Sequence, residues 1–171
     1  MAPEFLTATL AADRARQEAI LGATVPHDWP DQLDVVRKRL EQLRAEPGLQ
    51  PWLLRAMLLR NERRMIGQVG FHTRPGEHYL DEFAAGGVEF GYTVFLTFRR
   101  LGYAREACSG LMDWAWRAHG VTRFVVSISP DNLASLALAR GLGFVRVGSH
   151  IDEEDGPEDV FRRDIAAQEV P

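Results

Sequence analysis

The stretch that decides the fold is VEFGYTVFLTFRRLGYAREA, which runs from Val88 to Ala107. Its first half is apolar, aromatic and β-branched, which is typical of a strand, and we expect a strand from Val88 to Leu96. After Gly102 the apolar residues follow a helical spacing, which predicts a helix from about Gly102 to Ala118. Two arginines stand just before this helix, where a structural helix start normally carries Asp, Glu, Ser or Thr.

The loop before this helix is predicted to bind an anion. A helix start offers main-chain N–H groups without partners inside the helix, together with a partial positive charge. Gly102 lacks a Cβ and lets the loop approach a ligand, while Arg99, Arg100 and Arg105 add full charges. These features favour a phosphate or pyrophosphate site, with a solvated basic turn as the plainer alternative. The lack of a Walker lysine and of a G-x-G-x-x-G motif disfavours a nucleoside triphosphatase or Rossmann site.

The rest of the chain alternates between helical and strand patterns. Helices are predicted at residues 13–21, 32–45 and 131–140, and strands within 52–60, 65–73, 122–129, 144–150 and 159–165. Residues 74–87 are expected to form a loop and the acidic segment 153–159 a turn. Trp29 is expected to pack, and Asp31 to cap the following helix. The order favours an α/β fold of the α+β type with a largely antiparallel sheet.

Composition excludes several classes of protein. With 171 residues, of which 46% are hydrophobic, the chain suits one globular domain and is short for two. A formal net charge of −4 leaves no broad basic field, so nucleic acid is not an expected partner. The single cysteine, Cys108, excludes an internal disulfide framework and is expected in the core, and the histidines lack metal-ligand spacing. No signal peptide and no apolar run of about 18 residues is apparent, so we expect a cytoplasmic protein without membrane contact.

The segment from Val88 to Gly148 resembles the GNAT superfamily of acetyl-CoA-dependent N-acetyltransferases, and is most similar to the ribosomal-protein N-terminal acetyltransferase branch. In that family a strand ends in a loop motif R/Q-x-x-G-x-G/A, which Arg99, Gly102 and Ala104 match. A second motif, N-x-x-A/S followed by a helix and GF, is matched by four residues: Asn132, Ser135, Gly143 and Phe144. Two motifs in this order, with a helix and a strand between them, are far more specific than either alone.

The resemblance implies one GNAT-like domain over residues 1–171. Its sheet would be twisted, mixed and mostly antiparallel, flanked by helices, with two splayed parallel central strands at 88–96 and 122–129. Coenzyme A would lie between these two strands. Residues 88–148 would then form the acetyl-CoA-binding core, and residues 1–50 a helical region on the acceptor side.

The implied co-substrate is acetyl-CoA, without a metal. Its pantetheine arm carries amides spaced like those of a peptide, so it would pair with the strand backbone of Thr93, Val94, Phe95 and Leu96. The pyrophosphate would rest on the main-chain amides of the next loop: Arg100, Leu101, Gly102, Tyr103 and Ala104. Arg105 would reach the pyrophosphate or the 3′-phosphate. Arg100 stands where many members carry glycine, and we expect the loop to tolerate it with φ below zero.

Glu89 matches the position where members of this branch carry a glutamate that faces the acceptor. We expect it to act as general base through water, because an alkylamine is mostly protonated near neutral pH. A half-buried carboxylate of raised pKa would suit this role, whereas a solvent-facing edge glutamate is the alternative. Many members carry a tyrosine acid where this chain has Ala139, so Ser135 or a water would protonate the leaving thiolate. Asn132 would bond to the pantetheine or orient water, besides capping its helix.

The expected function is direct transfer of acetyl from acetyl-CoA to a primary amine, with a small-molecule amine favoured as acceptor. A protein N-terminal amine stays open, and so does a CoA-binding sensor or interaction module that has lost turnover. The expected partners are therefore acetyl-CoA and an amine acceptor, with neither nucleic acid nor membrane, in a monomer or a homodimer.

Overall fold

The computed structural model describes residues 1–152 and 156–165. The chain divides into two compact units. The first consists of Met1–Gly70 and Tyr92–Ala104, and the second of Phe71–Gly91 and Arg105–Pro171. Strand β3 (Val88–Val94) runs from the second unit into the first, and the next boundary falls in the first turn of helix α5 (Tyr103–His119).

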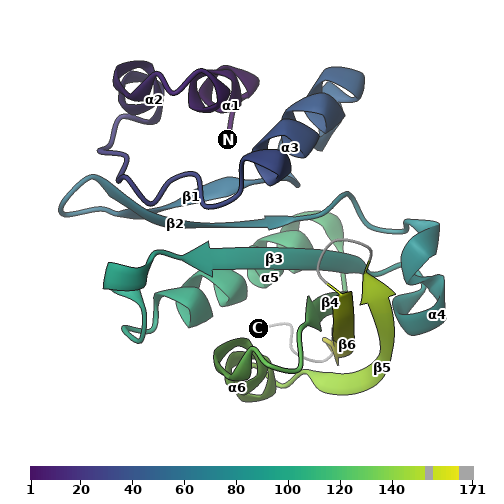
Figure 1. The fold of residues 1–171 in the computed structure, drawn as a ribbon. Helices are drawn as coiled ribbons and strands as arrows, with labels where there is room; N and C mark the ends of the chain where they lie inside the picture. Colours follow the sequence, from purple (N-terminus) through teal and green to yellow (C-terminus); the bar gives the residue numbers. More distant parts are fainter. Residues whose placement is uncertain (153–155, 166–171) are drawn as a thin grey trace. The chain divides into compact units, whose positions relative to one another are not determined.

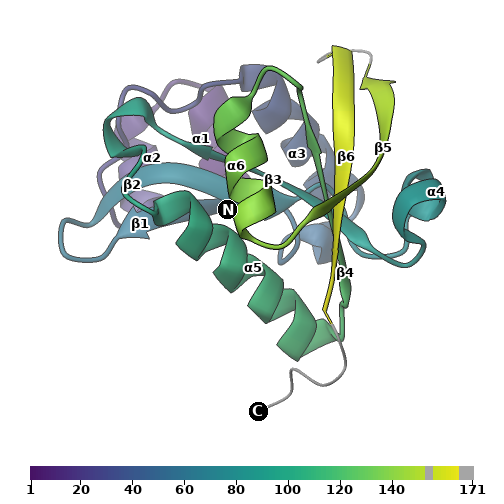
Figure 2. The same ribbon diagram turned by 90° about the horizontal axis from the view of Figure 1, so that it is seen from below.

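Within the described residues, six strands form a mixed sheet in the order β1-β2-β3-β4-β6-β5 (Figure 1). The other strands are β1 (Arg55–Leu59), β2 (Arg64–Phe71), β4 (Arg123–Ile128), β5 (Val145–Asp152) and β6 (Gly156–Asp164). The pairs β1/β2, β4/β6 and β5/β6 are antiparallel, whereas β3 and β4 are parallel. Figure 2 shows β6 between its neighbours β4 and β5. The predicted α/β fold with a mostly antiparallel mixed sheet is confirmed.

The first unit opens with helices α1 (Pro3–Leu10), α2 (Arg14–Leu21) and α3 (Leu33–Ala45), followed by the 3-10 helix η1 (Pro47–Leu49). Their apolar side chains form a core with β2 and with Phe95, which follows β3. Trp29 packs in this core as predicted, with 2% of its surface exposed, and its Nε1 donates to Thr9 Oγ1 at 3.1 Å. Helix α1 was not predicted, because it is short and its N-cap residue, Ala2, makes no side-chain cap bond.

The predicted cap at Asp31 is wrong. Helix α3 begins at Leu33, and its N-cap residue Gln32 makes no side-chain cap bond. The Asp31 carboxylate instead accepts a hydrogen bond from Gln68 Nε2 of β2 at 3.4 Å. A local capping signal is therefore overridden by a polar partner that lies 37 residues further along the chain.

The second unit contains two short elements where residues 74–87 were expected to form a loop. They are the 3-10 helix η2 (His78–Leu80) and the one-turn helix α4 (Asp81–Ala84). This segment folds because Leu80 and Ala84 are buried in a cluster with Val125 of β4 and Val160 of β6. A single helical turn is too short to show a hydrophobic period in the sequence, which is why the loop prediction is wrong here.

An aromatic and aliphatic core lies elsewhere in the same unit. The Phe71 ring is 6.1 Å from that of Phe90 and 6.4 Å from that of Phe124, between centroids, and the Phe90 ring is 6.0 Å from that of Phe144. Cys108 of α5 is fully buried, as predicted, and burial raises the pKa of its thiol to about 12.

Helix α6 (Leu133–Gly141) and the pair β5/β6 complete the second unit. Residues 153–155 of the predicted acidic turn lie outside the described residues. The remainder of that segment, from Gly156 to Asp159, belongs to β6, so this strand is longer than predicted. Asp159 forms an ion pair with Arg146 of β5 at 2.7 Å, which shows how an acidic residue is accommodated in the strand.

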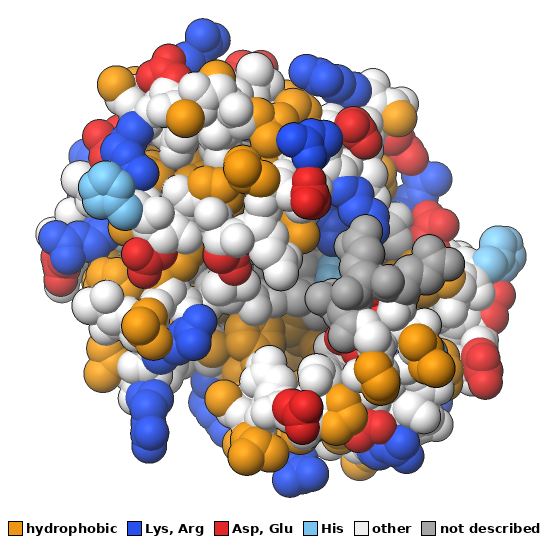
Figure 3. All heavy atoms as spheres, in the orientation of Figure 1, with side chains coloured by type: hydrophobic (Ala, Val, Ile, Leu, Met, Phe, Trp, Pro, Cys, Tyr) orange, Lys and Arg blue, Asp and Glu red, His pale blue; other side chains and the backbone are white. Residues whose placement is uncertain are grey.

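The surface shows mixed charge. On the face drawn in Figure 3, lysine and arginine side chains alternate with aspartate and glutamate rather than forming one basic field. No helix within residues 1–152 and 156–165 combines the length and apolar character needed to cross a bilayer.

Two glycines give opposite predictions for stability. A Cβ on Gly67 of β2 would collide with the main-chain carbonyl of Thr93, whereas a Cβ on Gly110 of α5 would meet no atom within 4 Å. Gly67→Ala should therefore lower the free energy of unfolding by about 1–3 kcal/mol. Gly110→Ala should raise it by up to about 1 kcal/mol, because alanine favours the helix. Urea denaturation checks both, and equal midpoints would contradict the close contact at Gly67.

Candidate active site

The predicted succession of strand, loop and helix is present between β3 and α5. The strand ends at Val94, two residues earlier than predicted, because Leu96–Phe98 form the 3-10 turn η3 and the Phe98 N–H donates to the Phe95 carbonyl at 2.9 Å. The loop Arg99–Gly102 follows, and α5 begins at Tyr103. Of the residues predicted to bind pantetheine, Thr93 and Val94 therefore belong to the strand, while Phe95 and Leu96 lie beyond it.

The loop has a conformation of the kind that binds anions. Arg100 has φ +63° and Gly102 has φ +87°, so both adopt the left-handed region. Arg100 does not meet the condition of φ below zero under which we expected the loop to tolerate it, and the loop holds a glycine-like backbone at a non-glycine residue. Left-handed residues in a turn let successive N–H groups face a common anion, and the free amides of the α5 start lie directly after them.

The arginines of the loop differ in what they contact. Arg99 Nε donates to the Val94 carbonyl at 2.8 Å and so ties the loop to the end of β3. Arg105 donates to the Gly141 carbonyl at the end of α6 at 3.0 Å, and a Cβ on Gly141 would collide with its guanidinium. Arg100 is exposed and makes no ion pair within the described part of the chain. Arg99 thus ties the loop to β3 and Arg105 ties α5 to α6, while Arg100 offers its charge to solvent.

The parallel contact of β3 with β4 is short. Only Val88 with Phe124 and Glu89 with Val125 are paired in this ladder. On its other edge β4 pairs with β6 over its whole length, up to Ile128. The parallel pair that the resemblance implied is present, and β4 continues past the last residue that it shares with β3.

The second predicted motif lies at the start of α6. The Asn132 Oδ1 accepts a hydrogen bond from the Ser135 N–H at 3.1 Å, which confirms the predicted helix cap. The cap uses the carbonyl oxygen of the side chain and leaves its amide nitrogen as a donor. Ser135 is half-buried, and Ala139, at the position of the family's tyrosine, is 4% exposed.

Glu89 lies at the centre of a polar cluster built entirely within the second unit. Only 6% of its surface is exposed, which excludes the alternative of a solvent-facing edge glutamate. Its Oε1 accepts from Ser127 Oγ of β4 at 2.5 Å, and its Oε2 lies 3.3 Å from His72 Nδ1, one residue beyond β2. The Tyr79 hydroxyl of η2 also donates to this carboxylate. We call these four residues the Glu89 centre.

The expected rise in the pKa of Glu89 is wrong. Burial does favour the neutral acid and is the largest single influence, but it is outweighed. Hydrogen bonding and charge from His72, with hydrogen bonds from Ser127 and Tyr79, lower the pKa from its ordinary value of 4.5 to about 2. The carboxylate is therefore ionised throughout the neutral range. His72, Ser127 and Tyr79 were not predicted, because their proximity depends on strand pairing that no local pattern shows.

The family model of the acetyltransferase (GNAT) domain matches residues 2–145, and the chain belongs to this family. The uncharacterized N-acetyltransferase YjdG of Bacillus subtilis is 27% identical over 142 residues, which cover 79% of each protein.

Solved structures share the fold. The ribosomal-protein-alanine N-acetyltransferase of Brucella melitensis has a TM-score of 0.62 at 18% identity, over 96% of this chain and 97% of that one. RimL, a ribosomal L7/L12 α-N-protein acetyltransferase solved in complex with coenzyme A, has a TM-score of 0.61 at 20% identity, over 96% and 91% of the two chains. The acetyl-CoA-dependent acyltransferase class follows from the family.

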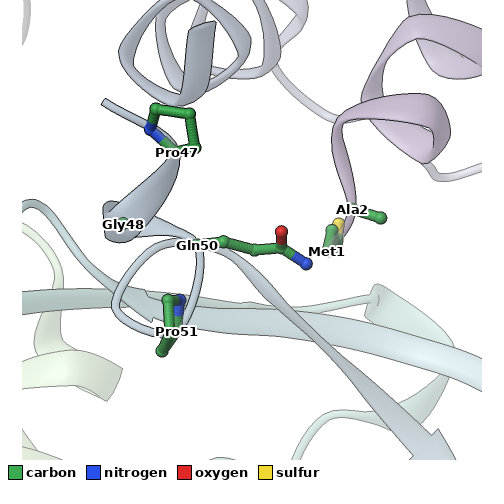
Figure 4. Close-up of a pocket in the computed structure, with 6 residues that line it drawn as sticks. All are labelled: Met1, Ala2, Pro47, Gly48, Gln50 and Pro51. Carbon is green, nitrogen blue, oxygen red and sulfur yellow. The ribbon is translucent and has the colours of Figure 1, made fainter. Parts of the chain in front are cut away.

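A separate pocket of about 460 Å³ lies in the first unit and contains none of the predicted site residues. It is lined by Met1, Ala2, Pro47, Gly48, Gln50 and Pro51, and Figure 4 shows the Gln50 side chain pointing toward Met1. Across residues 1–152 and 156–165, no three His, Cys, Asp or Glu side chains are grouped so that they could hold a metal ion.

The lowered pKa of Glu89 predicts a pH dependence of stability. A carboxylate whose pKa falls on folding stabilises the fold above the unfolded value of 4.5, and this contribution is lost as the pH falls toward 2. Over that window the wild type should lose about 3 kcal/mol more unfolding free energy than Glu89→Gln. Urea denaturation at stepped pH measures this. The exposed Glu41→Gln is the control, and parallel curves for wild type and Glu89→Gln would contradict the lowered pKa.

Proposed function

We propose that the protein transfers acetyl from acetyl-CoA directly to a primary amine. The observation that carries the proposal is the left-handed loop at the start of α5, which follows, after the turn η3, the strand that holds a buried, ionised Glu89. In this reaction the amine nitrogen bonds to the thioester carbon, the carbon–sulfur bond breaks, and coenzyme A leaves as a thiol.

The loop residues fit the acidic end of coenzyme A. The main-chain amides of residues 100–104 and the charge of Arg100 would hold the pyrophosphate, and the open space around Gly102 leaves room for it. The main chain of residues 93–96 would pair with the pantetheine amides. The side-chain amide nitrogen of Asn132, which its helix cap does not use, would be a donor to the co-substrate. Bound in this way, acetyl-CoA supplies the activated acyl group.

The Glu89 centre would attract the amine acceptor and help to deprotonate it. An ionised carboxylate attracts a cationic ammonium, and removal of an ammonium proton, directly or through water, gives the neutral nucleophile. On the side of the leaving group, Ala139 has no proton to give. Ser135 or a water would therefore protonate the CoA sulfur, a modest demand because a thiolate is a tolerable leaving group.

We infer a small-molecule amine as the acceptor, as expected from the sequence. A protein N-terminal amine is the second candidate. It is favoured by the similarity to solved structures named as ribosomal-protein acetyltransferases. A CoA-binding module without turnover is the third reading, permitted by the alanine at the family's tyrosine position.

Thiol release from acetyl-CoA distinguishes these readings. The wild type should release coenzyme A in the presence of at least one primary amine, and mass spectrometry should detect the acetylated product. The acceptors tested include small amines and short peptides that have free amino termini. A comparison of their kcat/KM values then shows which class is the better acceptor. Tight CoA binding without release for any amine would contradict an enzyme and support the module.

A charge at the loop tests the cofactor site. Gly102→Glu brings a side chain and a negative charge to a left-handed position beside the expected pyrophosphate. It should weaken CoA binding at least tenfold, which corresponds to about 1.4 kcal/mol. Gly110→Glu adds the same side chain to an open position further along α5 and should leave affinity unchanged. Calorimetry measures both, and equal affinity of the two variants would place CoA elsewhere.

A further inference from the structure

His72 is a second titratable group in the Glu89 centre, and the proposed function gives it no role of its own. We propose that His72 Nε2 accepts the proton of the amine, and that Glu89 acts as the positioning residue that holds the imidazole. This inference rests on the proposed function, since it names the base of that same reaction.

The main chain and the carboxylate together fix the imidazole. The His72 N–H donates to the Glu89 carbonyl at 2.9 Å, so the two residues are aligned across neighbouring strands. The side chains then meet through His72 Nδ1 and Glu89 Oε2, 3.3 Å apart. A neutral imidazole that donates from Nδ1 carries its lone pair on Nε2. The contact with Glu89 therefore selects the tautomer in which Nε2 is the basic atom.

The main chain of Gly91 packs closely against this basic atom. A Cβ on Gly91 would lie 3.1 Å from His72 Nε2, closer than side chains normally approach. Gly91 is two residues after Glu89 on β3, so the two positions share one face of the strand. The bare main chain at Gly91 thus borders Nε2, and any larger residue there would crowd it.

The exposure of the two side chains assigns their roles. The His72 side chain is 41% exposed, whereas that of Glu89 is 8% exposed. An amine that arrives from solvent can therefore reach the imidazole, while the carboxylate lies behind it. The hydroxyls of Ser127 and Tyr79 also donate to this carboxylate.

Protonation of Glu89 would weaken the hydrogen bonds that stabilise its carboxylate. Its oxygens accept from His72, Ser127 and Tyr79, and these bonds favour the ionised form, with a pKa of about 2. A carboxylate of such low pKa is a weak base near neutral pH. Its contact with His72 Nδ1 at 3.3 Å is well suited, however, to keep the ring in one orientation.

The proton balance of the step is simple. An ammonium gives one proton to His72 Nε2, and the neutral amine then attacks the thioester carbon. The carbon–nitrogen bond forms and the carbon–sulfur bond breaks, and the second amine proton goes to the CoA sulfur through Ser135 or water. The imidazolium releases its proton to solvent before the next turnover.

His72→Ala tests the assignment by chemical rescue. With an alkylamine acceptor it should lower kcat at least about 100-fold while CoA affinity by calorimetry stays unchanged. Added imidazole should restore part of the rate, because a small base can take the vacated place. Glu89→Gln should also be slow, but imidazole should not restore it. His119→Ala, at an exposed histidine at the end of α5, is the matched control and should keep the wild-type rate.

A second readout does not depend on turnover. Long-range proton–nitrogen NMR of the wild type at mildly alkaline pH should show the His72 proton on Nδ1, and Glu89→Gln should alter this tautomer. Wild-type turnover that persists in His72→Ala, or a proton found on Nε2, would overturn the assignment and leave the acetyltransferase proposal standing. Failure of the wild type to acetylate any amine would instead overturn the proposed function, and the role of His72 with it.

Discussion

The structure depends on satisfying one buried negative charge in the middle of a sheet. Glu89 is nearly inaccessible to water, so its ionisation must be balanced by donors from the protein. Those donors come from three places in the chain: His72 after β2, Tyr79 in η2 and Ser127 in β4. Loss of any one would leave the carboxylate partly unsatisfied, so the charge joins elements that are distant in sequence.

The loop before α5 is defined by its backbone conformation. Arg100 adopts a left-handed conformation that costs a non-glycine residue about 1–2 kcal/mol, and Gly102 repeats that conformation without the cost. The bond from Arg99 to the Val94 carbonyl ties this turn to the end of β3, and that from Arg105 to the Gly141 carbonyl ties α5 to α6. Strain kept in place at the start of a helix is typical of a site built for a ligand.

Local sequence patterns were sufficient to predict those parts of the structure that depend on residues close together in the chain. The run from Val88 to Ala107 predicts strand, loop and helix because apolar spacing and one glycine determine them within 20 residues. The Asn132 cap was predictable for the same reason. The resemblance drew attention to Glu89, but the sign of its pKa shift depended on His72, Ser127 and Tyr79. Strand pairing and the packing of η2 bring these together, and no periodicity in one chain shows either of them.

The one cysteine of the sequence has a practical consequence. Cys108 is fully buried in α5, and a thiol with a pKa of about 12 has almost no thiolate near neutral pH. A disulfide dye that reports free sulfhydryl groups should thus detect the coenzyme A product, because the protein's own thiol should not react with the dye. The native chain can be followed by such colorimetry without engineering, and it should tolerate oxidants that inactivate proteins with exposed thiolates.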